Sequence, residues 1–158
     1  MAVKKFYNLA KKDFFPLCRS ITGKGTLKTL KIIKKNFNSL KLKSIKSGKK
    51  VFDWTIPSQW EIKTAYLTDK FGKRIIDFRD NNLHLVGYSN PIKKKITLKQ
   101  LLKHLHSLPE QPNAIPYVTA YYKNYWGFCV THNQKKKIIK DYKLNDKFFV
   151  NISSSFNR

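Results

Sequence analysis

Acidic residues are scarce in this chain, which has nine Asp and Glu against 33 Lys and Arg in 158 residues. Cysteine is scarcer still, because Cys18 and Cys129 are the only two. They lie so far apart in sequence that neither a disulfide framework nor a CxxC metal or redox motif can be built from them. We therefore expect both to be reduced thiols.

Long apolar runs are also absent. Charges interrupt every apolar run in residues 1–15, so this segment lacks the continuous apolar core of a signal peptide. No later run approaches the length that a membrane-spanning helix needs. We expect a cytoplasmic protein with no membrane association.

The positive charge is unevenly distributed. Residues 1–50 carry a net charge of +14, residues 93–103 carry five Lys, and residues 135–158 carry a net +5, whereas residues 51–92 and 104–134 are balanced. Only four of the cations are Arg, although specific readout of phosphates and bases favours the bidentate Arg fork. We interpret most of the lysine as solvated surface and expect only weak, non-specific polyanion binding.

Two amphipathic helices are predicted within residues 1–50. Apolar residues recur at helical spacing over residues 6–17, where Pro16 interrupts the last turn, and again over residues 27–37. Gly23 and Gly25 lie between them, but the GxxxxGK[ST] pattern of a phosphate loop is missing. We interpret these glycines as marking a helix end and a helix start.

From residue 40 onward the apolar period shortens toward two, which favours strands. A strand is predicted at residues 40–45, a β-hairpin at 60–80 around the turn from Asp69 to Gly72, a third strand at 83–89 and a last strand at 147–156. In the hairpin, Ile62, Thr64 and Tyr66 should share one face. The second part of the chain is therefore expected to be mostly antiparallel β.

Two capping boxes predict short helices among these strands. Thr97 precedes Gln100 by three residues, and Thr131 precedes Gln134 in the same way. In such a pair the hydroxyl and the amide satisfy free backbone donors reciprocally. We expect one helix over residues 97–108 and another from His132 to about residue 140.

The stretch YYKNYWGFCVTH, which ends at His132, could be a Cys/His catalytic site, a base-stacking platform or core. Cys129 lies before a predicted helix, which can lower the pKa of a thiol, but large apolar groups flank it and nothing nearby orients the histidine. We favour a buried structural thiol over a nucleophile. Tyr122, Trp126, Phe128 and Cys129 are expected to pack in the core, with His132 at the start of an exposed helix.

The remaining histidines do not suggest a metal site. His104 and His106 would diverge by roughly 200° on a helix, so they could not share a metal there. His84 is isolated in sequence. Because zinc enzymes need three converging protein ligands, we assign no metal ligand and no catalytic residue.

Asp53 is the most notable acid, because it lies between Phe52 and Trp54. A carboxylate among aromatic rings can serve as a general acid, although an Asp that accepts backbone hydrogen bonds in a turn before proline is commoner. Aromatic residues could also line a ligand groove, while core is their usual place. The candidate groove residues are Asp53, Trp54, Tyr122, Trp126 and His132.

Five blocks of the sequence resemble, in order, the N-terminal portion of a bacterial aminopeptidase-like family: PLCRSITGKG, VFDWTIPSQWEI, RIIDFRDNNLHLVGYS, HLHSLPEQPNAIPYVTAYY and WGFCVTH. That family is similar to zinc aminopeptidases with a mixed α/β catalytic domain, into which a mostly β domain of unknown function is inserted. Some members are labelled polysaccharide-biosynthesis proteins with an aminopeptidase-like domain.

The resemblance implies an α+β fold with a specific domain order. Residues 1–50 look like the two N-terminal helices and first strand of an incomplete α/β peptidase-like domain. Residues 51–145 look like the inserted, mostly antiparallel β-rich domain with short helices, and residues 146–158 look like a strand that returns to the peptidase-like domain.

In the family, the zinc-binding stretch follows the inserted domain and would lie beyond residue 158. The resemblance therefore implies zinc for the full-length family but no cofactor and no catalytic residue in this chain. We expect a non-catalytic N-terminal portion of an aminopeptidase-like zinc hydrolase, inactive alone, whose partner is the missing C-terminal catalytic region. Whether the chain is itself an enzyme stays open. The alternatives are a standalone lysine-rich module that binds nucleic acid or another polyanion, and a protein-interaction or homo-oligomerisation domain.

Overall fold

The computed structural model describes residues 2–157, which form two compact units. Unit 1 comprises the chain up to Glu61 together with the segment from Ser155, and unit 2 comprises Ile62–Ser154. The structure mixes helices with antiparallel strands, which confirms the predicted α+β class. The predicted domain bounds at residues 50 and 145 stay a prediction. No helix within residues 2–157 is long and apolar enough to cross a membrane.

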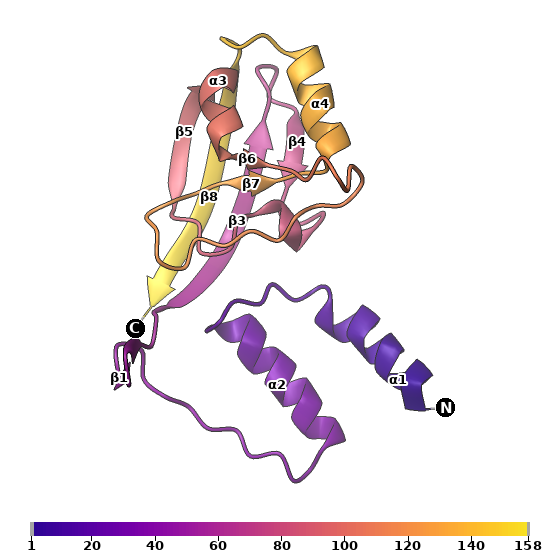
Figure 1. The fold of residues 1–158 in the computed structure, drawn as a ribbon, viewed down its shortest axis with the longest axis vertical. Coiled ribbons are helices and arrows are strands. Elements are labelled where there is room, and N and C mark those ends of the chain that lie inside the picture. Colours follow the sequence, from indigo (N-terminus) through magenta and orange to yellow (C-terminus); the bar gives the residue numbers. More distant parts are fainter. Residues whose placement is uncertain (1, 158) are drawn as a thin grey trace. The chain divides into compact units, whose positions relative to one another are not determined.

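Unit 1 contains mainly helix (Figure 1). Its elements are α1 (Ala2–Leu9), a π-helical turn η1 (Ala10–Phe14), α2 (Lys24–Asn36) and a small hairpin of β1 (Lys50–Val51) and β2 (Trp54–Thr55). The two predicted helices are therefore confirmed, with the first of them shorter and ending before Pro16.

The two glycines of the SITGKG segment lie at the start of α2. Gly23 is the residue before the helix and has a φ of 132°, in the left-handed region that favours glycine. Gly25 lies in the first turn, where an added Cβ would be 1.8 Å from the carbonyl oxygen of Cys18. Both glycines thus belong to the helix start, and neither marks a helix end.

The strand predicted at residues 40–45 is wrong, because this segment has no regular secondary structure. Leu40 and Leu42 are half-buried and alternate with exposed lysines, as the pattern suggested. However, no neighbouring strand in residues 2–157 pairs with them. Alternation alone cannot make a strand, since the backbone donors and acceptors of a strand need a partner.

Unit 2 is built on a four-stranded sheet in the order β4-β3-β8-β5. The strands are β3 (Gln59–Thr68), β4 (Arg74–Asp77), β5 (Ile92–Thr97) and β8 (Lys147–Asn157), of which the first and last extend into unit 1. Pairs β3–β4 and β5–β8 are antiparallel, and Figure 1 shows β3 and β8 running in opposite directions. The predicted hairpin and the predicted last strand are confirmed.

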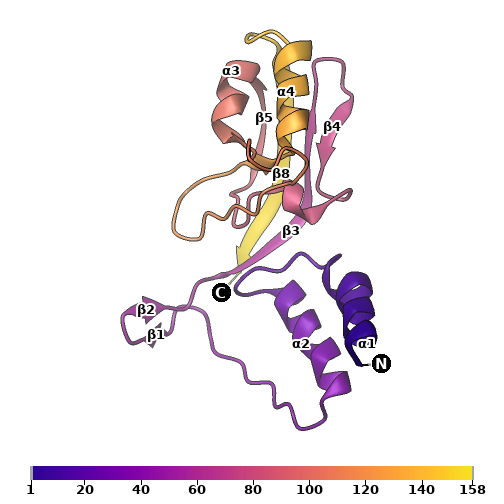
Figure 2. The same cartoon turned by 45° about the vertical axis from the view of Figure 1, so that its right-hand side comes forward.

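The helices of unit 2 begin where the capping boxes predict. Both boxes are complete, with Thr97 starting α3 (Leu98–Leu101) and Thr131 starting α4 (His132–Asp141). In Figures 1 and 2 these helices lie over the same face of the sheet. Buried side chains fill the space between: Leu67, Ile76, Ile96, Leu98, Leu101, Ile138, Phe148, Val150 and Ile152.

One other predicted element in unit 2 is wrong, and a second ends earlier than predicted. The strand expected at residues 83–89 is a 3-10 turn (Asn82–His84) followed by isolated bridges, since Asn81 caps the turn and Tyr88 adopts a φ of 64°. The helix expected at 97–108 ends after a 3-10 turn (Leu102–His104), because β6 (Leu105–His106) pairs in parallel with β7 (Phe128–Cys129). Strand β5 was not predicted.

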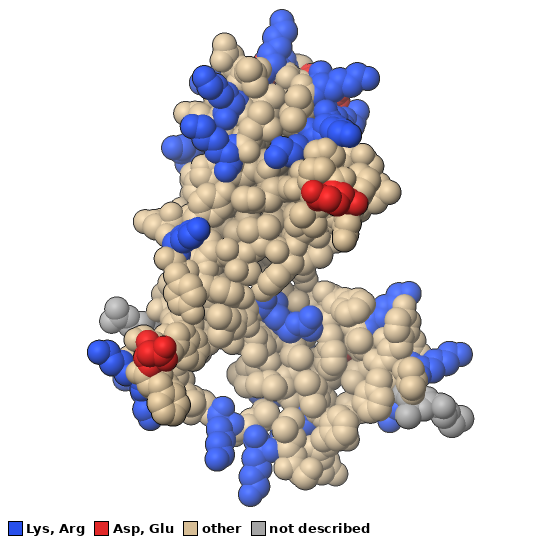
Figure 3. Space-filling model, viewed as in Figure 1, with Lys and Arg blue, Asp and Glu red and all other residues tan. Residues whose placement is uncertain are grey.

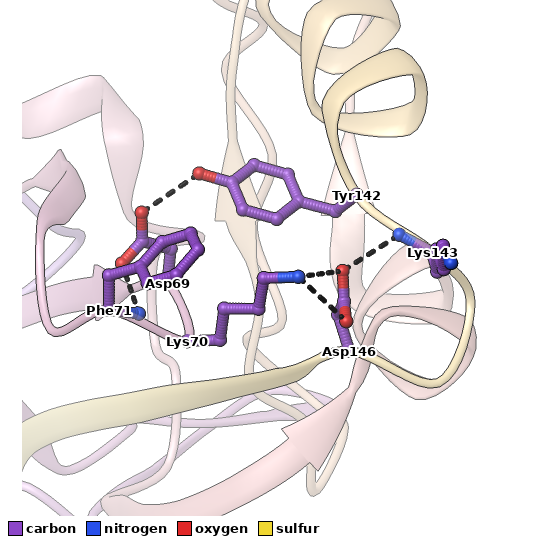
Figure 4. A network of polar contacts seen from close by, with 6 residues as sticks. All are labelled: Asp69, Lys70, Phe71, Tyr142, Lys143 and Asp146. Atoms are coloured by element: carbon purple, nitrogen blue, oxygen red, sulfur yellow. Dashed lines mark hydrogen bonds and ion pairs between the residues drawn. The ribbon is translucent and has the colours of Figure 1, made fainter.

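One end of the sheet is held by a polar network (Figure 4). The Tyr142 hydroxyl donates to Asp69 at 2.9 Å, and Lys70 contacts Asp146 at 3.0 Å. Burial works to raise the pKa of Asp69, but hydrogen bonds from Tyr142 and from the backbone N–H groups of Lys73 and Phe71 hold it below its ordinary value. This network joins the β3–β4 turn to the segment between α4 and β8.

Candidate functional site

The most unusual segment of unit 2 is the loop between β6 and β7, residues 107–127. It has no regular helix and, apart from one isolated bridge, no strand. Connections longer than roughly 15 residues without secondary structure are uncommon and usually functional or disordered. This one is ordered, because its backbone is hydrogen-bonded to Gly87, Asn90 and Asn133. We take this loop as the candidate functional segment.

Two histidines, His104 and His106, contact the last residues of the loop. The His104 ring stacks on Trp126 with 3.9 Å between centroids, and its Nδ1 lies 2.8 Å from the Trp126 carbonyl oxygen. His106 Nε2 lies 2.9 Å from the Tyr125 hydroxyl, which donates to the Lys103 carbonyl. The two histidines therefore contact one aromatic pair, although β6 rather than a helix carries the second of them. This corrects the expected divergence on a shared helix.

His106 is half-buried and lies near positive charge. Its partial burial lowers its pKa, and the nearby cation of Lys135 lowers it further. Lys135 itself donates to the Leu105 carbonyl at 2.8 Å. These contacts are thus suited to positioning the loop.

Cys129 has the structural role that the sequence favoured. Its side chain is fully buried in a cluster with Val86 and Ala120, and burial raises its thiol pKa to about 12. A thiol of this kind is a poor nucleophile at neutral pH. His84 Nδ1 contacts the Cys129 carbonyl oxygen at 2.8 Å, so this buried histidine also has a structural partner.

His132 begins α4 as predicted, and its Nδ1 lies 3.1 Å from the Ser107 hydroxyl. A Ser–His pair can form a nucleophilic dyad, but a productive site also needs a third group that orients the base. Among the described residues, no carboxylate accepts a hydrogen bond from His132. We therefore assign this contact to attachment of the loop onto the start of α4.

The outer part of the loop carries exposed tyrosines. Tyr117 is 65% exposed and Tyr122 is 77% exposed, so the expectation that Tyr122 packs in the core was wrong. Phe128 and Cys129 are fully buried as expected, and Trp126 is half-buried. Tyr121 is half-buried and Tyr122 is exposed, and the chain turns at these two residues.

Contacts between rings and hydroxyls join these tyrosines into one cluster. The Tyr117 and Tyr121 hydroxyl oxygens are 3.0 Å apart, and the Tyr121 ring meets the Tyr88 ring edge-on at 4.7 Å. Tyr122 meets Tyr121 at 6.4 Å. Burial, together with the hydrogen bond to Tyr117, raises the pKa of Tyr121. Below, "the tyrosine cluster" means Tyr88, Tyr117, Tyr121 and Tyr122.

The buried member of the cluster, Tyr88, has a strained backbone conformation. Tyr88 is buried and has a φ of 64°, which a bulky aromatic residue rarely adopts and which costs of order 1–3 kcal/mol. Ser89 beside it donates to the Val86 carbonyl, and Ser154 donates to the Ser89 carbonyl at 2.7 Å. Asn90 follows, and its side-chain amide donates to Asn124 on the loop. The surrounding hydrogen bonds therefore hold Tyr88 in an otherwise unfavourable conformation.

The other two candidate groove residues lie in unit 1. Asp53 and Trp54 follow Phe52, which has a φ of 54°, in the tight β1–β2 hairpin. Asp53 is exposed to solvent rather than enclosed by the neighbouring rings. Because three of the five candidates are in unit 2 and two are in unit 1, their assignment to one groove stays a prediction.

Within residues 2–157, no three His, Cys, Asp or Glu side chains form a group that could hold a metal ion. The zinc that the resemblance implies for the full-length family therefore has no fitting set of ligands within residues 2–157.

Residues 59–155 match the family described as domain of unknown function DUF2172. A Clostridium acetobutylicum protein, named for a proposed role in polysaccharide biosynthesis and for an aminopeptidase-like domain, is 47% identical over 137 residues. These residues cover 87% of this chain and 31% of the relative.

A crystal structure from Clostridium acetobutylicum, of a protein named as a proposed peptidase, is also similar. Its TM-score is 0.89 at 44% sequence identity, and the match covers 99% of this chain and 35% of that one. The chain thus spans about a third of the length of the relatives that it matches.

Sequence reasoning missed Tyr88, Tyr117 and Tyr121 as functional candidates. The crowding of tyrosines into the segment from Tyr117 to Tyr125, after a proline-broken stretch, was the available signal. It did not distinguish buried rings from exposed ones, because that depends on where the loop is attached.

Proposed function

The chain belongs to the DUF2172 family, and from this premise we propose that it is a non-catalytic portion of an aminopeptidase-like hydrolase. In this proposal unit 1 supplies one layer of a larger α/β domain, and the remainder of that domain supplies the catalytic groups. The name of the curated relative also suggests polysaccharide biosynthesis as the process. We extend that process to this chain as part of the proposal.

The observation that carries the proposal is the exposed apolar face of unit 1. No residue of α2 is buried, although its apolar side chains recur at helical spacing. Several large apolar side chains of the two helices are more than a third exposed: Val3, Phe6, Tyr7, Leu27, Leu30 and Phe37. An amphipathic helix normally buries such a face against another layer, and extended apolar patches mark interaction sites. We propose that the covering layer is the region present in the relatives and outside their match to this chain.

Co-purification tests this proposal. The chain is mixed with the remainder of the Clostridium acetobutylicum relative, produced separately, and the mixture is analysed by size-exclusion chromatography. We expect a stable complex, which a Leu27→Gln/Leu30→Gln double variant loses. The matched control, Lys28→Gln/Lys31→Gln on the same helix, should retain it because these lysines are solvated. Absence of a complex, or equal binding by both variants, would contradict the proposal.

Catalysis is tested in the same samples. We expect the isolated chain to release no chromophore from an aminoacyl p-nitroanilide, because no set of metal ligands converges within residues 2–157. Turnover by the isolated chain that a chelator abolishes and zinc restores would show that the hydrolytic groups lie in this chain after all.

A further inference from the structure

We propose that the tyrosine cluster on the β6–β7 loop is a binding site for neutral glycan chains. This inference goes beyond the proposed function and does not rest on it, since it concerns unit 2 alone. It starts from the two exposed rings, Tyr117 and Tyr122, which the fold supports but does not bury.

The shape of the cluster selects a flat, amphipathic ligand. Tyr117 and Tyr122 offer exposed ring faces, and a tyrosine hydroxyl can both donate and accept a hydrogen bond. The side chains of Asn90 and Asn124, each two residues along the chain from a cluster tyrosine, are hydrogen-bonded to each other. A pyranose ring has a matching structure, with a face of C–H groups that can lie on an aromatic ring and hydroxyl groups around its edge. The C–H face of the sugar would therefore stack on a tyrosine ring, while its hydroxyl groups would form hydrogen bonds with polar groups around that ring.

Local charge argues against a nucleic acid at this site. Residues 104–134 carry one Lys, Lys123, and one Glu, Glu110, in a chain whose net charge is +24. In the view of Figure 3, Lys and Arg gather at the top, over α3, β5 and α4, whereas the surface directly below these elements is mostly uncharged. Binding to single-stranded nucleic acid combines aromatic stacking with several cations along the phosphates. A neutral ligand fits the uncharged surroundings of the cluster better.

The supporting structure also indicates a preformed site. The backbone N–H of Gly87 donates to the Val118 carbonyl at 2.9 Å, and Ala120 donates back to Gly87 at 2.9 Å. Asn90 donates from its backbone to Tyr125 at 2.8 Å. These bonds fix both ends of the tyrosine segment against residues 87–90, so that little ordering is needed on binding.

The test is a glycan array probed with the full chain at physiological salt. The array carries neutral hexose and N-acetylhexosamine oligosaccharides beside uronate-containing and sulfated ones, and poly(U) RNA is measured separately by fluorescence anisotropy. We expect binding to neutral oligosaccharides, weakened at least about tenfold by Tyr117→Ala/Tyr122→Ala, since the variant loses two exposed aromatic rings together. Both tyrosines are exposed, so circular dichroism should show that the variant still folds.

Phe71→Ala is the matched control, because Phe71 is an aromatic residue that is 80% exposed on the β3–β4 turn, outside the cluster. It should bind like the unaltered chain. Absence of binding to every neutral oligosaccharide, or equal binding by the tyrosine variant, would overturn the inference. So would binding confined to acidic glycans, or tyrosine-dependent binding confined to poly(U). Because the remainder of the relative is absent from this assay, its outcome is separate from that of the co-purification.

Discussion

The two units bury apolar surface to very different extents. Among the described residues of unit 1, only Ile56 and Trp60 are buried hydrophobic residues, whereas unit 2 has a continuous set of them across its sheet and helices. Unit 2 also buries polar groups with hydrogen-bond partners, such as Asp69 and His84. Unit 1 has two well-patterned helices and almost no core of its own.

This difference shows that amphipathic patterning and core formation are separate properties. The helices of unit 1 have the apolar spacing of core-facing helices, but a helix can bury a face only against a second layer. In unit 2 the sheet supplies that layer for α3 and α4. The free energy of unfolding should therefore respond to side-chain truncation in unit 2 and much less in unit 1.

The largest expected effect is in unit 2. Replacing the fully buried Phe128 with Ala should lower the free energy of unfolding by about 3–5 kcal/mol, because the loss of a large aromatic side chain leaves a cavity. Leu30→Ala in α2 should cost less than about 1 kcal/mol, since Leu30 is partly exposed. Urea unfolding followed by circular dichroism measures both. Equal losses at the two sites would remove the contrast between the units.

A backbone collision should affect unit 1 selectively. Gly25→Ala should cost about 1–3 kcal/mol as an overpacking change, because the new Cβ would meet the Cys18 carbonyl. We expect faster hydrogen exchange in α2 and unchanged exchange in the sheet of unit 2. Lys28→Ala, an exposed position on the same helix, is the control. If exchange in the sheet also increased, the two units would be a single cooperative unit.

The capping boxes allow a finer comparison within unit 2. Thr131→Ala should cost about 1 kcal/mol, because the Thr131 hydroxyl accepts from the Gln134 backbone N–H at 3.0 Å. Thr131→Ser should retain most of that stability, since it keeps the acceptor. Thermal unfolding by calorimetry measures both variants. Equal destabilisation by the Ala and Ser substitutions would assign the effect to the lost methyl group instead.

The smallest effect is a change in acid sensitivity. Hydrogen bonds from Arg79, followed by that from Arg74, hold the pKa of Asp77 well below its ordinary value of 3.8. A depressed folded-state pKa contributes stability that is present above pH about 4 and is lost as the pH falls below it. Asp77→Asn should therefore reduce the slope of unfolding free energy against pH below 4, and the exposed Asp80→Asn should not. An unchanged slope in Asp77→Asn would show that this carboxylate does not govern acid sensitivity.

Local signals in the sequence predicted local structure well. The capping boxes at Thr97 and Thr131 located two helix starts, and the alternation around the turn after Asp69 located the hairpin. The burial of Cys129 followed from its large apolar neighbours. In each case the deciding interactions lie within a few residues of each other, so a single sequence contains them.

Strand pairing between distant segments could not be predicted from these local signals. Residues 40–45 alternate like a strand yet pair with no strand among residues 2–157, whereas β5 is a strand because β8 supplies its partner from 50 to 60 residues later. The expected helix at 97–108 stops early because Leu105 and His106 pair with β7. Secondary structure at these positions depends on backbone hydrogen bonds to distant segments, which local periodicity does not encode.

For this protein the sequence by itself determined the helix starts, the hairpin, the buried thiol and the resemblance to an aminopeptidase-like family, because each rests on neighbouring residues or on ordered blocks of them. Only the tertiary structure decided which tyrosines are exposed and which support them. Tyr88 and Tyr121 meet across more than thirty positions, and the hydrogen bonds that hold the loop to residues 87–90 leave Tyr122 in solvent. Exposure of a side chain is set by what packs around it, and in this loop the surrounding residues come from separate parts of the chain.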